Sequence, residues 1–368
     1  MAILSKPKPG SKNPPKPLSL SFTNLRSLRN KFDHIESFLQ NSSPDIFAVC
    51  ETNLNDSIDS SDFLVNGYLP LNRKDSTSHM LGLGVYVREN LPISREKSLE
   101  SPNHSFMCFR ISLLHSTSYL FFLYRSPESQ SCIVIDSVSE SIDKALVAHP
   151  SANIFVFGDF NIHHSEWLPF SGPTSEAGIN TFNFAISQSL TQLVDFPTRF
   201  PDRSDHNPSL LDLFLSSNPD ICKVSSSSPL GKSDHAVVNV EINLNVPGAS
   251  DSPQHRTLYS FERGDWDSFR DFVRDIPWDH IFNLDTDACA LEFVSWLQAG
   301  IDAFVPHRTY QLKPHSSPWF SPACAAAIAH CNHYFHKFQR SRSNSDKDNF
   351  TQARNECKGV LAQAKIHV

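Results

Sequence analysis

The sequence lacks three features that would each assign it to a different class of protein. No apolar run within its 368 residues is long enough to span a membrane. The first ten residues contain no apolar signal core, so we expect no export. The eight cysteines include no Cys-x-x-Cys pair, which is typical of reduced, mostly buried thiols. We therefore expect an intracellular protein with no membrane partner.

An excess of basic residues is also missing. The formal net charge is −7, which argues against a protein that coats nucleic acid through its overall charge. It does not exclude a nuclease, because a cation in the active site needs acidic ligands. The charge is unevenly distributed: from Lys313 to Lys365 there are eight Lys or Arg against three Asp or Glu, so the rest carries −12. This asymmetry predicts two functionally different parts.

Composition and periodicity divide the chain into four segments. Residues 1–17 contain five prolines and no apolar pattern, which predicts a disordered leader. Between residues 18 and 244, apolar strand patterns alternate with helical ones, which indicates an α/β layered fold. A linker rich in Pro, Gly and Ser follows at 245–258. The remaining residues, 259–368, show helical periodicity and predict a helical connector.

The most informative stretch is a short apolar strand at residues 154–157 that stops at Gly158. Asp159 and Asn161 follow, separated by Phe160. Because residues two apart in an extended segment point to the same side, we expect Asp159 and Asn161 to face one pocket and Phe160 to face the core. A capping turn is the alternative interpretation of this pair.

The same design of polar residues at the end of an apolar run recurs four times, at residues 23–24, 50–52, 123–125 and 233–235. Glu51 follows a buried strand, so it is either solvated or a ligand of a hard cation. Asp234 beside His235 could orient the imidazole if the fold turns both toward a common partner, but a surface turn would have the same sequence.

As an ordered set, these stretches resemble the endonuclease/exonuclease/phosphatase superfamily. The resemblance is closer to the endonuclease domain of jockey-like non-LTR retrotransposons, and residues 194–199 and 210–216 fit that group too. It covers residues 18–244 and implies a four-layered α/β sandwich like that of deoxyribonuclease I, followed by the helical connector. Apurinic endonucleases carry an acidic residue where this chain has Arg26, so abasic-site repair is not implied.

The resemblance also implies a role for each polar residue. Glu51 would be the main ligand of Mg²⁺, for which Mn²⁺ could substitute, with support from Asn24 and Asp234. The implied catalytic residues are Asp159, which would activate the attacking water, Asn161 as a transition-state donor, Tyr124 as a phosphate contact, Asp212 as an orienting carboxylate, and His235 on the scissile phosphate with Asp234 as its partner. The implied substrate-binding residues are Arg125, Thr198 and His163.

The implied function is Mg²⁺-dependent nicking of double-stranded DNA in the nucleus. The nick would leave a 3′-hydroxyl that primes reverse transcription of the element RNA. By the same resemblance, the connector would lead towards a reverse transcriptase. The chain itself contains no Phe/Tyr-x-Asp-Asp polymerase signature. Two alternatives stay open: a phosphoesterase of the same superfamily that acts on a lipid or inositol phosphate, and a catalytically dead nucleic-acid-binding remnant.

Overall fold

The computed structural model describes residues 16–75, 82–114, 116–128, 133–201, 207–246, 255–279, 285–311 and 319–366. The chain divides into two compact units, one formed by residues 1–250 together with 317–368 and the other by residues 251–316. Most of the expected leader (residues 1–15) and the middle of the expected linker (residues 247–254) lie outside the described residues.

Two six-stranded sheets form the body of the first unit. One has the order β11-β12-β1-β2-β4-β3 and the other the order β5-β6-β7-β8-β10-β9. Within each sheet one central pair is parallel, β1 with β2 and β7 with β8, and the other pairs are antiparallel. The strands of the first sheet are β1 (Lys16–Asn24), β2 (Ile46–Cys50), β3 (Asn72–Asp75), β4 (Gly82–Val87), β11 (Cys222–Ser227) and β12 (Val237–Val246). Those of the second are β5 (Ile93–Arg95), β6 (Phe106–Ser112), β7 (Thr117–Tyr124), β8 (Asn153–Asp159), β9 (Thr191–Gln192) and β10 (Asp212–Ser216).

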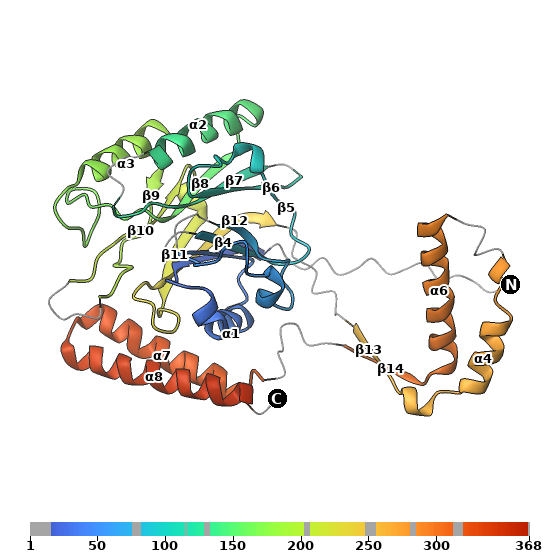
Figure 1. Ribbon diagram of the computed structural model, residues 1–368. Coiled ribbons are helices and arrows are strands. Elements are labelled where there is room, and N and C mark those ends of the chain that lie inside the picture. The colour runs from blue at the N-terminus through green and yellow to red at the C-terminus, as the bar shows by residue number, and fades with distance from the viewer. Residues whose placement is uncertain are drawn as a thin grey trace. The chain divides into compact units, whose positions relative to one another are not determined.

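The sheets pack face to face and helices cover their outer faces. Phe22 and Phe157, one from each sheet, meet between them with ring centroids 5.2 Å apart. Strand β2 is buried on both sides: Ala48 belongs to the core between the sheets and Phe47 to the core under α1 (Phe32–Ser42). Helices α2 (Ile133–Ala148) and α3 (Glu176–Ser187) cover the second sheet (Figure 1). The four-layered α/β sandwich predicted from the resemblance is confirmed.

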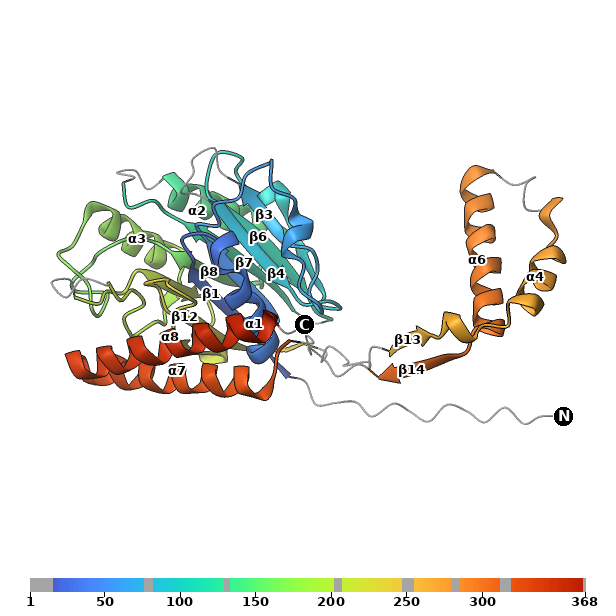
Figure 2. The same cartoon turned by 60° about the horizontal axis from the view of Figure 1, so that its bottom comes forward.

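The first unit also contains a helical hairpin, α7 (Pro322–Ser341) and α8 (Asn344–Ile366), which lies beside α1 in both views (Figures 1 and 2). Phe335 of α7 packs on Phe200 with ring centroids 5.2 Å apart. Lys365 of α8 binds Asp33 of α1 at 2.6 Å. We expected residues 259–368 to form one connector, and the structure corrects this boundary. The apolar stripe of α7 and α8 is buried against Phe200 and Ala236, so the hairpin belongs to the sandwich.

The second unit combines helices with a small sheet. Strands β13 (His255–Tyr259) and β14 (His307–Gln311) pair antiparallel, and α4 (Trp266–Arg274) packs with α6 (Thr286–Phe304) through Phe272 and Trp296. The sequence predicted only helices in this region. The short 3-10 helices in the described part of the chain are η1 (Arg29–Lys31), η2 (Ser60–Phe63), η3 (Lys97–Leu99), η4 (Pro219–Ile221) and η5 (Phe261–Arg263).

Among the described residues, no helix combines the length and apolar character needed to cross a membrane.

Candidate active site

The polar residues at the strand ends meet at one edge of the sandwich. Asn24 ends β1 and lies beside Cys50, the residue before Glu51, because β1 and β2 are parallel neighbours. In the second sheet, Tyr124 of β7 lies beside Asp159 of β8. Asp159 in turn lies opposite Asp212, the first residue of β10. The register of the two sheets therefore gathers residues that are up to 188 positions apart, from Asn24 to Asp212.

A hydrogen-bond network joins the two sheets at this edge. The Nδ2 of Asn24 donates to Glu51 Oε1 at 2.7 Å and to Asp159 Oδ2 at 2.9 Å. The Tyr124 hydroxyl donates to the same Glu51 oxygen at 2.9 Å. Asn161 donates its backbone N–H to Asp159 Oδ1 at 3.2 Å. Asp159 is fully buried rather than at the surface of a pocket, and its oxygens are held by donors from both sheets.

His235 pairs with Asp212 and not with its neighbour in sequence. The Nδ1 of His235 lies 2.8 Å from Asp212 Oδ2, and both side chains are buried. Asp234 instead binds Arg199 at 3.0 Å and Arg26 at 3.4 Å. This corrects the predicted Asp234–His235 partnership. Successive side chains of an extended segment point to opposite sides, so Asp234 and His235 have different hydrogen-bond partners.

Burial and charge give the central residues unusual proton affinities. Burial, followed by the charge of Asp212, raises the pKa of Asp159 to about 7. Burial alone would lower the pKa of His235, but the charge and hydrogen bond of Asp212 outweigh it and raise that pKa to about 9. Near neutral pH, Asp159 can therefore exchange a proton while His235 carries a positive charge.

The carboxylates beside His235 fit a divalent cation. Asp159, Asp212 and His235 each have a polar atom within 4.8 Å of the others, but only the two carboxylates can bind a cation while His235 is protonated. The Oδ1 of Asp212 is buried and has no hydrogen-bond partner, an arrangement that a cation would stabilise. Glu51 adds a carboxylate through the Asn24 bridge. Asp234, which we predicted as a ligand, lies outside this group because both of its oxygens face arginines.

Asn24 contributes to this group differently from the prediction. We expected it to support the cation, but its amide nitrogen faces the carboxylates of Glu51 and Asp159. Its Oδ1 accepts from the backbone N–H of Arg26 at 3.1 Å. In this arrangement Asn24 reduces the repulsion between two carboxylates by donating to both.

The loops that carry these residues hold strained backbone. Glu51 and Asn161 adopt left-handed conformations, with φ of 52° and 47°. Gly158 has a φ of 138°, and a Cβ at this position would lie 1.9 Å from the carbonyl oxygen of Leu123. For the two non-glycine residues, Glu51 and Asn161, such conformations cost roughly 1–3 kcal/mol each and persist where the surrounding fold imposes them, most often at functional sites.

A cavity of about 640 Å³ adjoins the network and is lined by Arg125, Asn161, His163 and Arg199, among others. Arg125 Nη1 donates to the carbonyl of Asn161 at 3.0 Å, and Asn161 Nδ2 donates to the carbonyl of Arg125 at 2.9 Å. His163 Nδ1 accepts from the backbone N–H of Gly172 at 3.2 Å. Two of the three predicted substrate-binding residues, Arg125 and His163, thus line the space next to Asp159.

The third, Thr198, does not line that cavity. Its side chain is fully buried, and Oγ1 accepts from the backbone N–H groups of Leu211 at 3.1 Å and Asp212 at 3.0 Å. Thr198 therefore positions Asp212. Sequence reasoning missed the residue beside it, Arg199, which binds Asp234 and lines the cavity. Its only signal was its place at the end of the segment 194–199.

Comparisons with known proteins show what the chain and its fold are similar to. Residues 118–239 match the model of the endonuclease-reverse transcriptase family. No curated protein sequence matches the chain. An AP endonuclease from Leishmania major has the same fold, with a TM-score of 0.50 and 13% identity over 61% of this chain and 88% of that one. The endonuclease domain of TRAS1, a telomere-specific non-LTR retrotransposon, aligns with 19% identity over 62% and 99% of the two chains, with a TM-score of 0.48.

Proposed function

We propose that this protein, whose sandwich is an endonuclease domain of the endonuclease/exonuclease/phosphatase superfamily, is the nuclease of a non-LTR retrotransposon and nicks double-stranded DNA. The observation that carries the proposal is the network from Tyr124 through Glu51 and Asn24 to Asp159, next to the Asp212–His235 pair. These residues would supply a proton acceptor, a proton donor and several cation ligands at one edge of the sandwich. Phosphodiester hydrolysis requires all three.

Each residue has a defined task in this reaction. Asp159 accepts a proton from the attacking water, which its pKa of about 7 permits. His235 is protonated at neutral pH and donates a charge-assisted hydrogen bond to the scissile phosphate. Asp212 holds the His235 ring by its Nδ1 and keeps it charged.

Glu51 and Asp212 would hold the cation, Mg²⁺ or Mn²⁺, next to Asp159. When bound, the ion stabilises the negative charge that develops on the phosphate oxygens. Tyr124 keeps its proton, because burial and the neighbouring Glu51 raise its pKa far above the usual value. Its hydroxyl is therefore a permanent donor, either to Glu51 or to a phosphate oxygen.

The nick would leave a 3′-hydroxyl on genomic DNA, so we expect the protein to act in the nucleus. A reverse transcriptase of the same element would extend this end with the element RNA as template. The link to a reverse transcriptase rests on the description of the family that residues 118–239 match.

A nicking assay tests the proposal. Supercoiled plasmid is incubated with the protein and Mg²⁺, with EDTA, or with the Asp159→Asn variant. We expect relaxed plasmid only with wild type and Mg²⁺, and we expect DNA polymerase to extend the nick without prior phosphatase treatment, since extension requires a 3′-hydroxyl. Intact plasmid together with phosphate release from a phosphoinositide would identify a phosphoesterase instead. Binding of the plasmid without any nick would identify an inactive remnant.

A further inference from the structure

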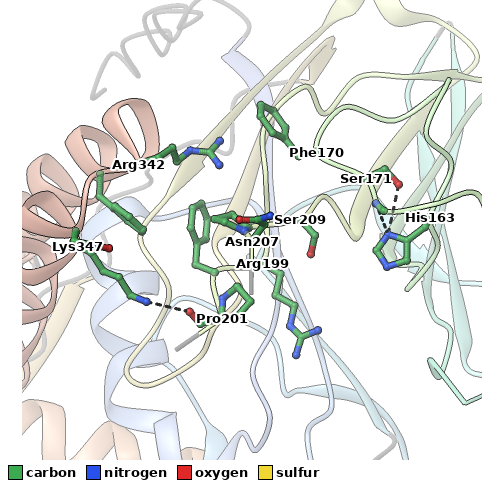
Figure 3. Close-up of a pocket in the computed structure, with 14 residues that line it drawn as sticks. His163, Phe170, Ser171, Arg199, Pro201, Asn207, Ser209, Arg342 and Lys347 are labelled. Carbon is green, nitrogen blue, oxygen red and sulfur yellow. Dashed lines mark hydrogen bonds between the residues drawn. The ribbon is translucent and has the colours of Figure 1, made fainter. Parts of the chain in front are cut away.

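The helical hairpin and the candidate active site share a second cavity of about 690 Å³. Figure 3 shows its lining, with Arg342 and Lys347 reaching in from the hairpin and His163 lying on the opposite side. His163 and Arg199 line both this cavity and the one that contains Asn161. The two cavities are therefore neighbouring parts of one surface that leads away from Asp159.

The lining of this cavity is basic although the chain as a whole is acidic. Among the described residues, its lining contains Arg199, Arg342 and Lys347 and no Asp or Glu, whereas the net charge of the protein is −7. Two described carboxylates near it have partners: Asp234 binds Arg199 at 3.0 Å, and Asp346 binds Lys337 at 3.0 Å. A concave surface with this charge attracts anions.

The cations of the cavity are held in place by other contacts. The guanidinium of Arg342 lies over the Phe170 ring at 4.8 Å, and its Nε donates to the carbonyl of Gln339 at 2.7 Å. Lys347 Nζ lies 3.5 Å from the carbonyl of Pro201. Asn207 and Ser209 add neutral polar groups beside them. Arginine, lysine and neutral polar side chains together are the set that contacts DNA phosphates and fixes the register of a duplex.

We infer that the α7–α8 hairpin is a DNA-binding part of the nuclease, in which Arg342 and Lys347 contact backbone phosphates beyond the scissile one. The inference rests on the proposed function and adds to it a binding surface from outside residues 118–239. The substrate class is duplex DNA long enough to extend past the cut site on one side, because the cavity adjoins the site that contains Asn161 but does not include it.

The variants must remove charge without disturbing the hairpin. Arg342 has a left-handed φ of 55° at the end of α7, a conformation that asparagine tolerates, so Arg342→Asn is preferred to alanine. Lys347→Gln keeps the length of the side chain. The matched control is Lys358→Gln, on the same helix as Lys347 and exposed, but outside the lining.

The test measures duplex binding by the full chain with fluorescence anisotropy across salt concentrations, in EDTA. Each lost phosphate contact should reduce the slope of log K against log[salt] by about 1, so Arg342→Asn/Lys347→Gln should lose about 2 while Lys358→Gln matches wild type. On a duplex that carries a preformed nick, shortening the DNA on one side of that nick should weaken binding by wild type and leave binding by the double variant nearly unchanged. A melting temperature equal to that of wild type shows that the fold is intact, and Lys347→Gln alone serves if it is not.

The outcomes separate the two proposals. If wild type nicks DNA but the double variant keeps the wild-type salt slope and length dependence, the hairpin does not bind DNA and only this inference fails. If wild type neither binds nor nicks duplex DNA, the proposed function fails and this inference fails with it. A loss of slope in Lys358→Gln equal to that of the double variant would show diffuse attraction by the basic region and would also overturn the inference.

Discussion

Replacing Asp212 with asparagine should remove the negative charge of this residue while keeping its size and its hydrogen bond to His235. The substitution keeps an oxygen that can accept from His235 Nδ1, at present 2.8 Å away. It removes the negative charge that raises the pKa of both His235 and Asp159. In the metal-free protein we therefore expect both pKa values to fall. Burial at His235 is then opposed only by the charges of Asp159 and Asp234, so a larger share of His235 should be neutral at pH 7 than in wild type.

The structure sets the size of the effect. The rise in the pKa of His235 from 6.5 to about 9 corresponds to about 3 kcal/mol. Because this folded-state pKa is raised, the contribution to stability is complete below pH 6.5 and is lost as the pH rises through about 9. Asp159 acts in the opposite direction: the rise in its pKa from 3.8 to about 7 is a cost that is absent at low pH and complete above pH 7, at about 4 kcal/mol.

The Asp212→Asn variant should accordingly be less stable than wild type near pH 6, where it loses the ion pair. The difference should shrink and reverse above pH 9, where wild type holds two buried carboxylates and a neutral His235. Urea unfolding in EDTA from pH 5 to 10 measures this, and the NMR titration of His235 reports its pKa directly. An unchanged His235 titration, or a stability difference independent of pH, would refute the assigned charge coupling.

Three further predictions concern neighbouring residues. Asp159→Asn should abolish nicking yet raise the metal-free unfolding free energy at pH 8 by at least about 1 kcal/mol; a lower melting temperature would mean that its role is structural. His235→Ala should slow plasmid nicking on the order of 10²–10³-fold, and near-wild-type nicking by His235→Gln would remove the need for a charged donor. Gly158→Ala should lower the free energy of unfolding, measured in urea, by more than about 2 kcal/mol. Gly359→Ala, in α8 with nothing within 4 Å of the added methyl, should instead raise it by up to about 1 kcal/mol.

The amino-acid sequence by itself determined the elements and the positions of the polar residues along them. The apolar run that ends at Gly158 forms strand β8, and the run before Glu51 forms β2. These signals are local, because a strand that is buried on both faces has a run of about five or six consecutive apolar residues. The ordered set of strand-end residues carried the family resemblance, and that resemblance predicted the four-layered sandwich.

The partners of those residues were decided only by tertiary structure. Whether His235 bonds to Asp234 or to Asp212 depends on which side of its segment packs against β10. The local sequence around His235 does not predict this packing. The helical periodicity of α7 and α8 likewise predicts the two helices but not the surface on which they pack. Its place on Phe200, and with it the position of Arg342 above Phe170, follows from two apolar surfaces that bury each other across more than a hundred residues of chain.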